Sequence, residues 1–499
     1  MNIRQAKEEI RQTLRAYLAK EDGHYLMPVI RQRPLLLMGA PGIGKTAVIE
    51  QIAEEEKVAL VSYTITHHTR QSAIGLPLIR EREYDGTTYS ATEYTMSEII
   101  ASIYERMQET GQKEGILFLD EINCVSETLA PIMLQFLQEK KFGNHRVPEG
   151  WVIITAGNPP EYNKSAREFD VVTLDRIRVL EIDADFPAWK TYAFENLVNP
   201  AIISYLELKQ ENFYRMETTT TGRRFVTARG WEDLSVLMGA YERLGLAITR
   251  DIAGEYLKQP EVADDFMNYL MLYHKYETVY QISTILEGKA SESLTARFAG
   301  APFDERISVI SMLLSGLGTR FAAARDSKYL TDTLYAALRE ARDSSDPAAV
   351  LAKAAETARN ALFTDSRGKT LSQDEKKRRE TAAAELSDYS RLAGEAGFDQ
   401  VKEKFRKHTD GKKKKDAACA QALEQTFAFL EQAGKVRSGE HLSGDTGSDL
   451  VYFVTELATN YLSMDFIRSH GSEAFYRYSS ETADDRTRRE LQQEISQLL

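Results

Sequence analysis

A glycine-rich segment near the N-terminus has the residue types that phosphate binding needs. It reads Gly39-Ala40-Pro41-Gly42-Ile43-Gly44-Lys45-Thr46. Glycine tolerates positive φ, so backbone N–H groups can curl around phosphate oxygens. Lys45 offers a charge to the β and γ phosphates, and the Thr46 hydroxyl is a ligand for Mg²⁺. The pattern predicts a nucleoside triphosphate site; the alternative is a glycine-rich turn without a ligand.

Two adjacent carboxylates, Asp120 and Glu121, follow the apolar run Gly115–Leu119. In an open parallel sheet, ligands bind at the carboxyl ends of the strands. Asp120 is therefore suited to the Mg²⁺ shell, and Glu121 to polarising the attacking water as a general base. The alternative for acids after a strand is a helix N-cap.

Asn158 stands at the end of a third apolar run, Val152–Thr155, and precedes Pro159. An amide at a strand end beside the phosphate loop can orient the lytic water and sense the γ-phosphate. Asn-Pro is also a turn signal, and the two interpretations are compatible.

The elements that must position these residues are short strands separated by helical patterns. The apolar runs are nearly continuous, as in strands buried on both faces of a parallel sheet. They cover Leu35–Met38, Val58–Thr64, Ile116–Leu119, Val152–Thr155 and Val179–Ile182. A helix from about Lys45 to Glu55 would point its positive dipole end at the nucleotide. The fold class is α/β with right-handed crossovers.

After Phe186-Pro187 the strand signals stop. Residues 191–290 have helical periodicity, and residues 291–499 are mostly helical with polar interruptions near 364–376, 408–416 and 436–449. The lysine-rich stretches Lys376–Arg379 and Lys412–Lys415 lie among acidic residues, which favours solvated surface over a nucleic-acid contact.

The composition narrows the class of protein. The 499 residues carry a net charge of −12, which argues against broad binding of nucleic acid or anionic membrane. Only two cysteines occur, which fits a reducing compartment. The N-terminal residues Ile3, Ile10, Leu14 and Leu18 predict an amphipathic helix and not a signal peptide. No run approaches the length of a membrane span, so a cytoplasmic location is expected.

The three motifs, in this order, resemble those of the AAA+ ATPases: Walker A, Walker B ending in Asp-Glu, and a sensor-1 Asn. Asp120-Glu121-Ile122-Asn123, Leu129-Ala130-Pro131 and Ala156-Gly157-Asn158-Pro159 narrow the resemblance to the MoxR clade, close to the dynein-related group. It covers roughly residues 30–270. Cys124 departs from it, standing where the family usually has Arg, and is expected to be a small buried filler.

The resemblance implies a P-loop αβα sandwich followed by a helical lid, and ATP with Mg²⁺ bound at subunit interfaces. We therefore divide the chain into residues 1–190 (nucleotide-binding domain with its N-terminal helix), 191–290 (lid) and 291–499 (helical, role unassigned). A ring of identical subunits, commonly a hexamer, is implied. So is a protein partner with a von Willebrand factor A domain.

Arginines that would complete the site are also carried over from the family. Asp175-Arg176-Ile177 resembles the family's Asp-Arg-Phe segment, which makes Arg176 the candidate arginine finger and Arg178 the reserve; Ile177 replaces the usual Phe. Thr227-Ala228-Arg229 resembles the sensor-2 segment, which makes Arg229 the candidate γ-phosphate sensor. Each arginine could instead be a surface ion-pairing residue.

Two hairpins are predicted where the family carries insertions. Residues 78–84 and 87–89 flank the turn Asp85-Gly86, and residues 141–147 turn at Gly143-Asn144. In the family such hairpins tend to face the pore, so Phe142, His145 and Arg146 are candidate client contacts. Plain surface hairpins are the alternative. His67-His68 is not expected to bind zinc, because adjacent residues do not converge on one ion.

The leading functional hypothesis is a ring-forming, MoxR-like ATPase that remodels a protein partner. A nucleic-acid translocase or restriction-type NTPase on the same core is the alternative. It draws on Lys140, Lys141, His145 and Arg146 but is disfavoured by the acidity of the chain. A nucleotide-gated scaffold without turnover is the third hypothesis. The preference for ATP over GTP stays open.

Overall fold

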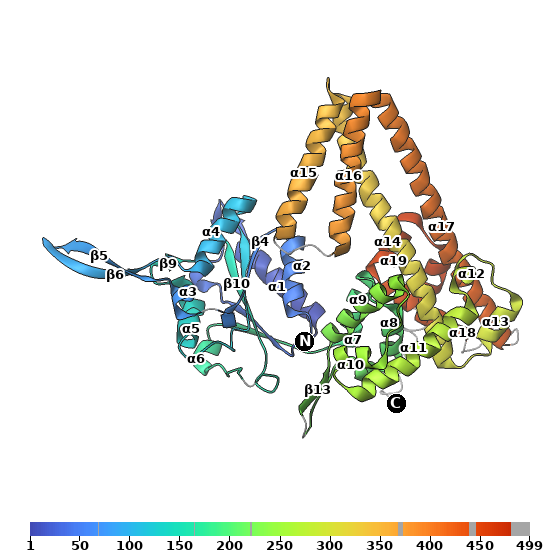
Figure 1. Ribbon diagram of the computed structural model, residues 1–499, viewed down its shortest axis with the longest axis horizontal. Coiled ribbons are helices and arrows are strands. Elements are labelled where there is room, and N and C mark those ends of the chain that lie inside the picture. The colour runs from blue at the N-terminus through green and yellow to red at the C-terminus, as the bar shows by residue number, and fades with distance from the viewer. Residues whose placement is uncertain (68, 164, 220–221, 368–372, 439–445, 481–499) are drawn as a thin grey trace, which may run out of the picture. The chain divides into compact units, whose positions relative to one another are not determined.

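The computed structural model describes the chain except for residues 68, 164, 220–221, 368–372, 439–445 and 481–499 (Figure 1). Contacts between residues divide it into two compact units. Unit 1 comprises Met1–Ala188 and Asn360–Lys376, and unit 2 comprises Trp189–Arg359 and Lys377–Leu499.

Unit 1 is built on a five-stranded parallel sheet. Its strands, in spatial order, are β11 (Arg178–Ile182), β3 (Leu35–Gly39), β10 (Trp151–Gly157), β7 (Gly115–Asp120) and β4 (Ala59–Thr64). All five predicted strands are present. The register places Asp120 opposite Thr64, Gly157 opposite Met38 and Ile182 opposite Gly39. The carboxyl ends of the strands therefore meet along one edge, where ligands bind in sheets of this kind.

Helices cover the sheet of unit 1, as the α/β prediction required. They are α1 (Ile3–Leu18), α2 (Lys45–Glu55), α3 (Arg70–Ile74), α4 (Glu98–Thr110), α5 (Ala130–Glu139) and α6 (Val171–Leu174), with 3₁₀ turns at Val29–Arg31 and Ile65–His67. Ile100 and Ile103 of α4 and Phe136 of α5 share a buried core with Leu117 and Leu119 of the central strand β7. This core fixes the strand that carries the two carboxylates.

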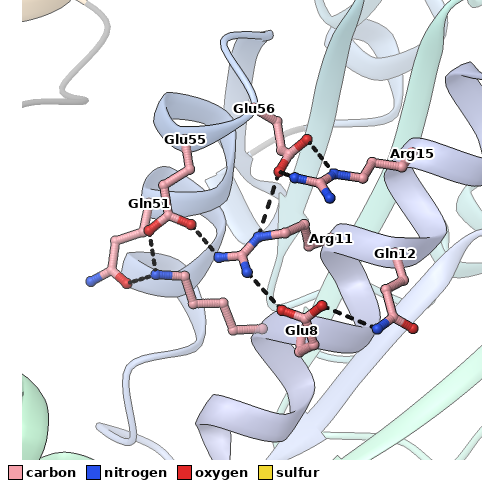
Figure 2. A network of polar contacts seen from close by, with 8 residues as sticks. Glu8, Arg11, Gln12, Arg15, Gln51, Glu55 and Glu56 are labelled. Atoms are coloured by element: carbon pink, nitrogen blue, oxygen red, sulfur yellow. Dashed lines mark hydrogen bonds and ion pairs between the residues drawn. The ribbon is translucent and has the colours of Figure 1, made fainter.

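The N-terminal helix α1 is bound to the helix that follows the phosphate loop. Its buried side includes Ile10 and Leu14, as the sequence predicted. Beside this face, charged residues join α1 to the end of α2. Figure 2 shows Arg11 in contact with Glu55 and Arg15 bound to Glu56, with both N···O distances of the second pair at 2.8 Å. Lys7 also pairs with Glu55, at 2.7 Å. Surface ion pairs contribute little singly, and a shared network contributes more.

Small antiparallel ribbons complete unit 1. β1 (Lys20–Glu21) pairs with β2 (His24–Tyr25), β5 (Pro77–Tyr84) with β6 (Thr87–Tyr94), and β8 (Lys141–Phe142) with β9 (His145–Arg146). Both predicted hairpins are present. Asp85 and Gly86 have φ of 49° and 78°, as a two-residue turn of type I′ requires. The β5–β6 hairpin projects from the sheet (Figure 1).

Unit 2 is mostly helical. Its helices are α7 (Phe186–Glu195, which begins in unit 1), α8 (Pro200–Leu208), α9 (Ala228–Leu244), α10 (Arg250–Tyr256), α11 (Pro260–Tyr280), α12 (Ile282–Leu286), α13 (Glu292–Ala299), α14 (Phe303–Arg342), α15 (Pro347–Arg367), α16 (Gln373–Ala396), α17 (Phe398–Ser438), α18 (Thr446–Thr459) and α19 (Tyr461–His470), with a 3₁₀ turn at Gln210–Asn212. The end of α15 and the start of α16 are grouped with unit 1 by their contacts.

The structure corrects two local predictions in unit 2. A hairpin of β12 (Arg215–Thr219) and β13 (Gly222–Val226) interrupts the range predicted to be all helical. β-branched threonines and the φ of 140° at Gly222 favour it. The interruption predicted at 408–416 lies inside α17, because lysine favours helices and Lys412 pairs with Asp416 one turn on, at 2.5 Å.

Two apolar cores formed by described residues join the later helices of unit 2. The first joins α12, α13, α14, α17, α18 and α19 around residues such as Leu313 and Phe427. The second lies among α14, α15, α16 and α17 around Leu334, Leu351 and Tyr389. α14 and α17 run through both cores, which makes them the common frame of the unit.

Among the described residues, helix α14 is long and apolar enough, by length and composition, to cross a membrane. Its best 18-residue window has a mean hydropathy of 1.5, and 67% of that window is buried inside the protein. Ile310, Leu313 and Leu317 on this helix are fully buried in the first core. Packing inside unit 2 accounts for the apolar composition.

Candidate active site

The phosphate loop connects β3 to α2 at the carboxyl edge of the sheet. A Cβ on Gly39 would lie 2.4 Å from the Ile182 carbonyl oxygen, so glycine here lets β11 pack against the loop. Gly44 has φ of 91° and is the N-cap of α2, so no side chain caps the first N–H groups of this helix. N–H groups at the start of a helix are the donors that bind anions. Ala40 and Ile43 are buried, while Pro41 and Gly42 are partly exposed.

The side chain of Lys45 joins the loop to the third predicted motif. Its Nζ donates to the carbonyl oxygens of Gly39 and Ala40, both at 2.8 Å, and to Oδ1 of Asn158 at 2.9 Å. The structure thus brings together two residues that are far apart in the sequence.

The hydroxyl of Thr46 lies beside the first carboxylate. Its Oγ1 donates to Oδ2 of Asp120 at 3.0 Å. Mg²⁺ in nucleotide sites takes one or two protein oxygens and completes its shell with phosphates and water. Thr46 and Asp120 are oxygen donors placed for that purpose, and Lys45 is a cation for the phosphates. The residues present therefore fit Mg²⁺ and a nucleoside triphosphate.

Glu121 has a contact that the sequence did not reveal. It has φ of 56°, and its backbone N–H donates to Oδ1 of Asp120 at 2.8 Å. The hydroxyl of Thr66, just after the neighbouring strand β4, donates to Oε2 of Glu121 at 3.0 Å. The sequence held one signal for this contact. Thr64 pairs with Asp120 at the end of the two strands, and the Thr66 hydroxyl follows two residues later.

Asn123 connects the Walker-B segment to the Asn158 segment. Its Nδ2 donates to the Asn158 carbonyl oxygen at 2.8 Å, and its Oδ1 accepts from the Asn158 N–H at 3.3 Å. The side chain is 3% exposed. Asn123 therefore acts on the site by positioning the loop of Asn158.

Family comparison agrees with this geometry. Residues 34–177 match the model of the AAA domain, dynein-related subfamily. This part of the chain is an AAA domain. It carries the phosphate loop, both carboxylates, Asn158 and Arg176, and it implies nucleotide binding and a general ATPase function. No curated protein matches the chain.

The two candidate finger arginines lie away from the phosphate edge of their own AAA domain. Arg178 pairs with Leu35 at the start of β3, about 13 Å along the strand from Gly39. Its guanidinium binds Thr13 at 2.9 Å and Glu9 at 2.8 Å on α1. Arg176 is exposed, and its Nη1 donates to Gln138 on α5. Arg176 is the more exposed of the two, and Arg178 is partly exposed.

Arg229 opens helix α9 in unit 2, as the sequence predicted for the start of that helix. Thr227 is the N-cap, and its Oγ1 accepts from the Gly230 N–H at 3.2 Å. The Arg229 side chain is exposed. Arg229 belongs to unit 2, and the AAA domain lies in unit 1. The role of Arg229 as a γ-phosphate sensor stays a prediction.

The prediction that Phe142 contacts a client is wrong. Its ring is 2% exposed and stacks on Phe136 with centroids 4.0 Å apart. Phe142 thus anchors the short β8–β9 hairpin to the core of the AAA domain. Arg146 is exposed, and His145 is partly exposed with Nε2 3.2 Å from the Tyr94 carbonyl oxygen.

Cys124 and the pair His67-His68 are the remaining residues for which the sequence made a prediction. The Cys124 thiol is partly buried and accepts from Nδ2 of Asn163 at 3.2 Å. Burial and the nearby carboxylates of Glu121 and Asp120 raise its pKa, which keeps the thiol neutral. His68 and the side chain of His67 lie outside the described residues.

Proposed function

We propose that this chain hydrolyses Mg²⁺-bound ATP at the carboxyl edge of its AAA domain. The observation that carries the proposal is the convergence of Lys45 on Asn158 and of Thr46 on Asp120, with Glu121 next in the chain. Three elements position these side chains: α2 carries Lys45 and Thr46, β7 ends in Asp120, and Asn158 follows β10. No simpler purpose explains a buried lysine facing an amide and two backbone carbonyls.

Each residue has a role that follows from its chemistry. Lys45 and the N–H groups of α2 bind the phosphates, while Thr46 and Asp120 hold the metal. Bound Mg²⁺-ATP supplies a reactive phosphoryl group with part of its charge neutralised. Glu121 orients the attacking water and accepts its proton, and Asn158 fixes the position of that water.

The same proposal includes assembly into a ring, most simply a hexamer. Arg176 is exposed at the edge of the sheet opposite the phosphate loop, which supports a role for it at the site of a neighbouring subunit. A cation supplied there would stabilise charge that develops on the transferred phosphoryl group. Arg178 binds Glu9 of α1 instead.

For the biological output, we propose a MoxR-like role in the cytoplasm. The ring would remodel or activate a protein partner, with a von Willebrand factor A domain protein as the expected one. Support comes from the resemblance of the motifs, from the net charge of −12 and from the exposed hairpin β5–β6. Burial of Lys140 and Phe142 weakens the alternative of a nucleic-acid translocase.

The test of catalysis is steady-state ATP hydrolysis by the full chain. Lys45→Ala should abolish nucleotide binding and turnover. Glu121→Gln should keep ATP binding and lower kcat at least about 100-fold, as expected for loss of a general base. Unchanged turnover in Lys45→Ala would overturn the proposal.

The test of output is capture of partners from the source cells. Glu121→Gln held in ATP should retain its client, and Lys45→Ala is the matched control because it lacks the nucleotide. An ATP-dependent protein partner supports remodelling. Recovery of nuclease-sensitive DNA or RNA in place of protein would overturn it in favour of a translocase.

A further inference from the structure

The β5–β6 hairpin leaves both of its faces uncovered by the described part of the chain. Every residue of β5 is exposed, and the Ile79 side chain reaches 75% exposure. Tyr84 and Tyr89 are 53% and 54% exposed. A lone two-stranded ribbon is marginally stable in water. A hairpin of this length with exposed apolar side chains therefore indicates that a partner covers it.

One face of the hairpin is acidic. The register pairs Glu81 with Ser90 and Glu83 with Thr88, so both carboxylates lie on the same face as Ile79. Neither carboxylate has an ion-pair partner within the described hairpin, and no Lys or Arg shares their face. We call this surface the acidic face; it consists of residues 77, 79, 81, 83, 88, 90, 92 and 94.

The opposite face is basic and aromatic. Arg80 and Arg82 both contact the single carboxylate of Glu93, the first with an N···O distance of 3.5 Å. One positive charge is left over on this face. The rings of Tyr84 and Tyr89 lie beside it with centroids 6.1 Å apart. We call this surface the basic face; it consists of residues 78, 80, 82, 84, 87, 89, 91 and 93.

We propose that the acidic face of one hairpin packs against the basic face of the hairpin in the neighbouring subunit. The occupant is a second copy of this chain, because one ribbon carries both halves of a complementary pair. Glu81 and Glu83 would meet Arg80 and Arg82, and Ile79 would meet the tyrosines. The inference rests on the ring assembly of the proposed function, which it deepens by naming the surface.

The geometry of such a contact suits a closed ring. Two different faces of the same element meet, so the contact is heterologous, and heterologous contacts build rings when the rotation closes. In a closed ring every hairpin has both faces covered. This removes the exposed apolar surface that an isolated ribbon would leave in water.

Charge reversal tests the pairing between faces. Glu81→Lys with Glu83→Lys breaks no ion pair or side-chain hydrogen bond of the described residues, and it places like charges opposite Arg80 and Arg82. We expect the protein concentration for half-maximal ATP-dependent assembly to rise roughly tenfold. Adding Arg80→Glu and Arg82→Glu in the same chain should restore assembly. Glu105→Lys with Glu149→Lys, two exposed carboxylates outside the hairpin, is the control of equal charge.

Cross-linking tests the contact directly. Cysteines at Ile79 and Tyr89, one on each face, should form disulfide-linked ladders with ATP in the Glu121→Gln background, after Cys124 and Cys419 are replaced by Ser and Ala. Cysteine at Ile79 alone should give no disulfide-linked dimer, because acidic faces do not meet each other. Sedimentation velocity measures assembly of the same samples.

The outcomes separate this inference from the proposed function. Assembly and ATPase unaffected by Glu81→Lys with Glu83→Lys, together with no ladder, would overturn the hairpin contact and leave the ring ATPase intact. Absence of ATP-dependent assembly in the unmodified chain would overturn the ring itself. Ladders that appear only after a client peptide is added would overturn the direct contact and assign the hairpin to client binding.

Discussion

The contact between Thr66 and Glu121 restrains the carboxylate of the proposed catalytic base. The hydroxyl donates to the carboxylate at 3.0 Å, and Thr66 itself is exposed. The contact occupies one carboxylate oxygen that would otherwise be available to the attacking water. The base therefore has a competing partner that must release it before it can serve the attacking water.

We predict that Thr66→Val raises basal ATP turnover a few-fold. Valine keeps the shape and removes the donor, so Glu121 loses its competing partner. KM for ATP should stay unchanged, because Thr66 contacts no phosphate-loop residue. Steady-state kinetics of Thr66→Val and the conservative Thr66→Ser, which keeps the hydroxyl, form the measurement. Equal turnover in all three proteins would contradict a restraining role.

Asn123 supports a second prediction. Asn123→Ala should lower the free energy of unfolding by about 1–3 kcal/mol, because the backbone groups of Asn158 lose their buried partners. The Asn158 side chain should then sit less firmly against Lys45, so kcat should fall more than the affinity for ATP.

Chemical denaturation and single-turnover kinetics measure the two effects of Asn123→Ala. Asn163→Ala is the matched control, because Asn163 binds only the weak acceptor Cys124 Sγ and its own loop. A loss of stability without any change in the ratio of kcat to ATP affinity would leave Asn123 with a purely structural role.

At the scale of elements, the residue between α5 and β8 carries a buried charge that destabilises the folded state. Lys140 is the left-handed C-cap of α5, with φ of 53°, and is 6% exposed. Its Nζ donates to the Val29 carbonyl oxygen at 2.5 Å. Burial lowers the pKa of Lys140 to about 8. The folded chain therefore binds fewer protons than the unfolded chain between about pH 8 and the ordinary lysine value near 10.4.

The sign of the pH effect follows from that difference. The cost of burying the charge is fully present below about pH 8 and is relieved as the pH rises toward 10.4. We predict that Lys140→Met raises the free energy of unfolding at pH 7 by about 1–2 kcal/mol, after loss of the Val29 hydrogen bond. The gain should shrink above pH 8.

Denaturant titrations from pH 7 to 10 measure the effect. Lys141→Met is the control, because Lys141 is only partly buried and pairs with Glu139 at 2.9 Å. A gain that stays constant over this range would show that Lys140 is charged in the folded state throughout.

The elements of the AAA domain were predictable because their signals are local. Five continuous apolar runs gave the strands, and α2 begins and ends at the predicted residues Lys45 and Glu55. The β12–β13 hairpin was missed because its threonines lie in a polar stretch without a clear period. The lysine run at 412–415 was predicted to interrupt a helix because of its charge, although lysine has a high helix propensity.

The residues of the candidate site also fall into those that local motifs predict and those that they do not. Lys45, Thr46, Asp120 and Asn158 follow from short motifs, and the structure brings them together. Thr66 and Asn123 depend on which strands are neighbours and in which register, and no local pattern records that. The predicted client contact of Phe142 was wrong because its ring packs against α5. The strands of this hairpin are only two residues long, so the ring lies next to that helix.

At the scale of the whole molecule, unit 2 crosses the boundary predicted at residue 290. Tyr280, Ile285 and Leu286 belong to the same core as Leu313 and Phe427. Buried ion pairs cross the boundary as well. Lys190 binds both Glu207 and Glu456, the latter at 2.8 Å, and burial raises the pKa of the Glu456 carboxyl. The predicted lid and the helices after it therefore depend on each other for stability.

We predict that a fragment ending at residue 290 does not fold as the full chain does. It would expose Tyr280, Ile285 and Leu286, leave Tyr269 without Ser308, and leave Lys190 without Glu456. Removing one partner of a buried pair costs about 3–5 kcal/mol. We expect aggregation or a broad thermal transition, with binding of a dye that detects exposed apolar surface.

The fragment ending at residue 188 is the control, because the core between the sheet and helices α4 and α5 lies wholly within it. It should unfold cooperatively and stay soluble. A soluble fragment 1–290 whose helices melt cooperatively, at the temperature of unit 2 in the full chain, would contradict the shared core. The helices after residue 290 would then form an independent domain, and substitutions on their surface would not change the stability of the predicted lid. Failure of both fragments would instead place essential contacts of unit 1 in residues 360–376.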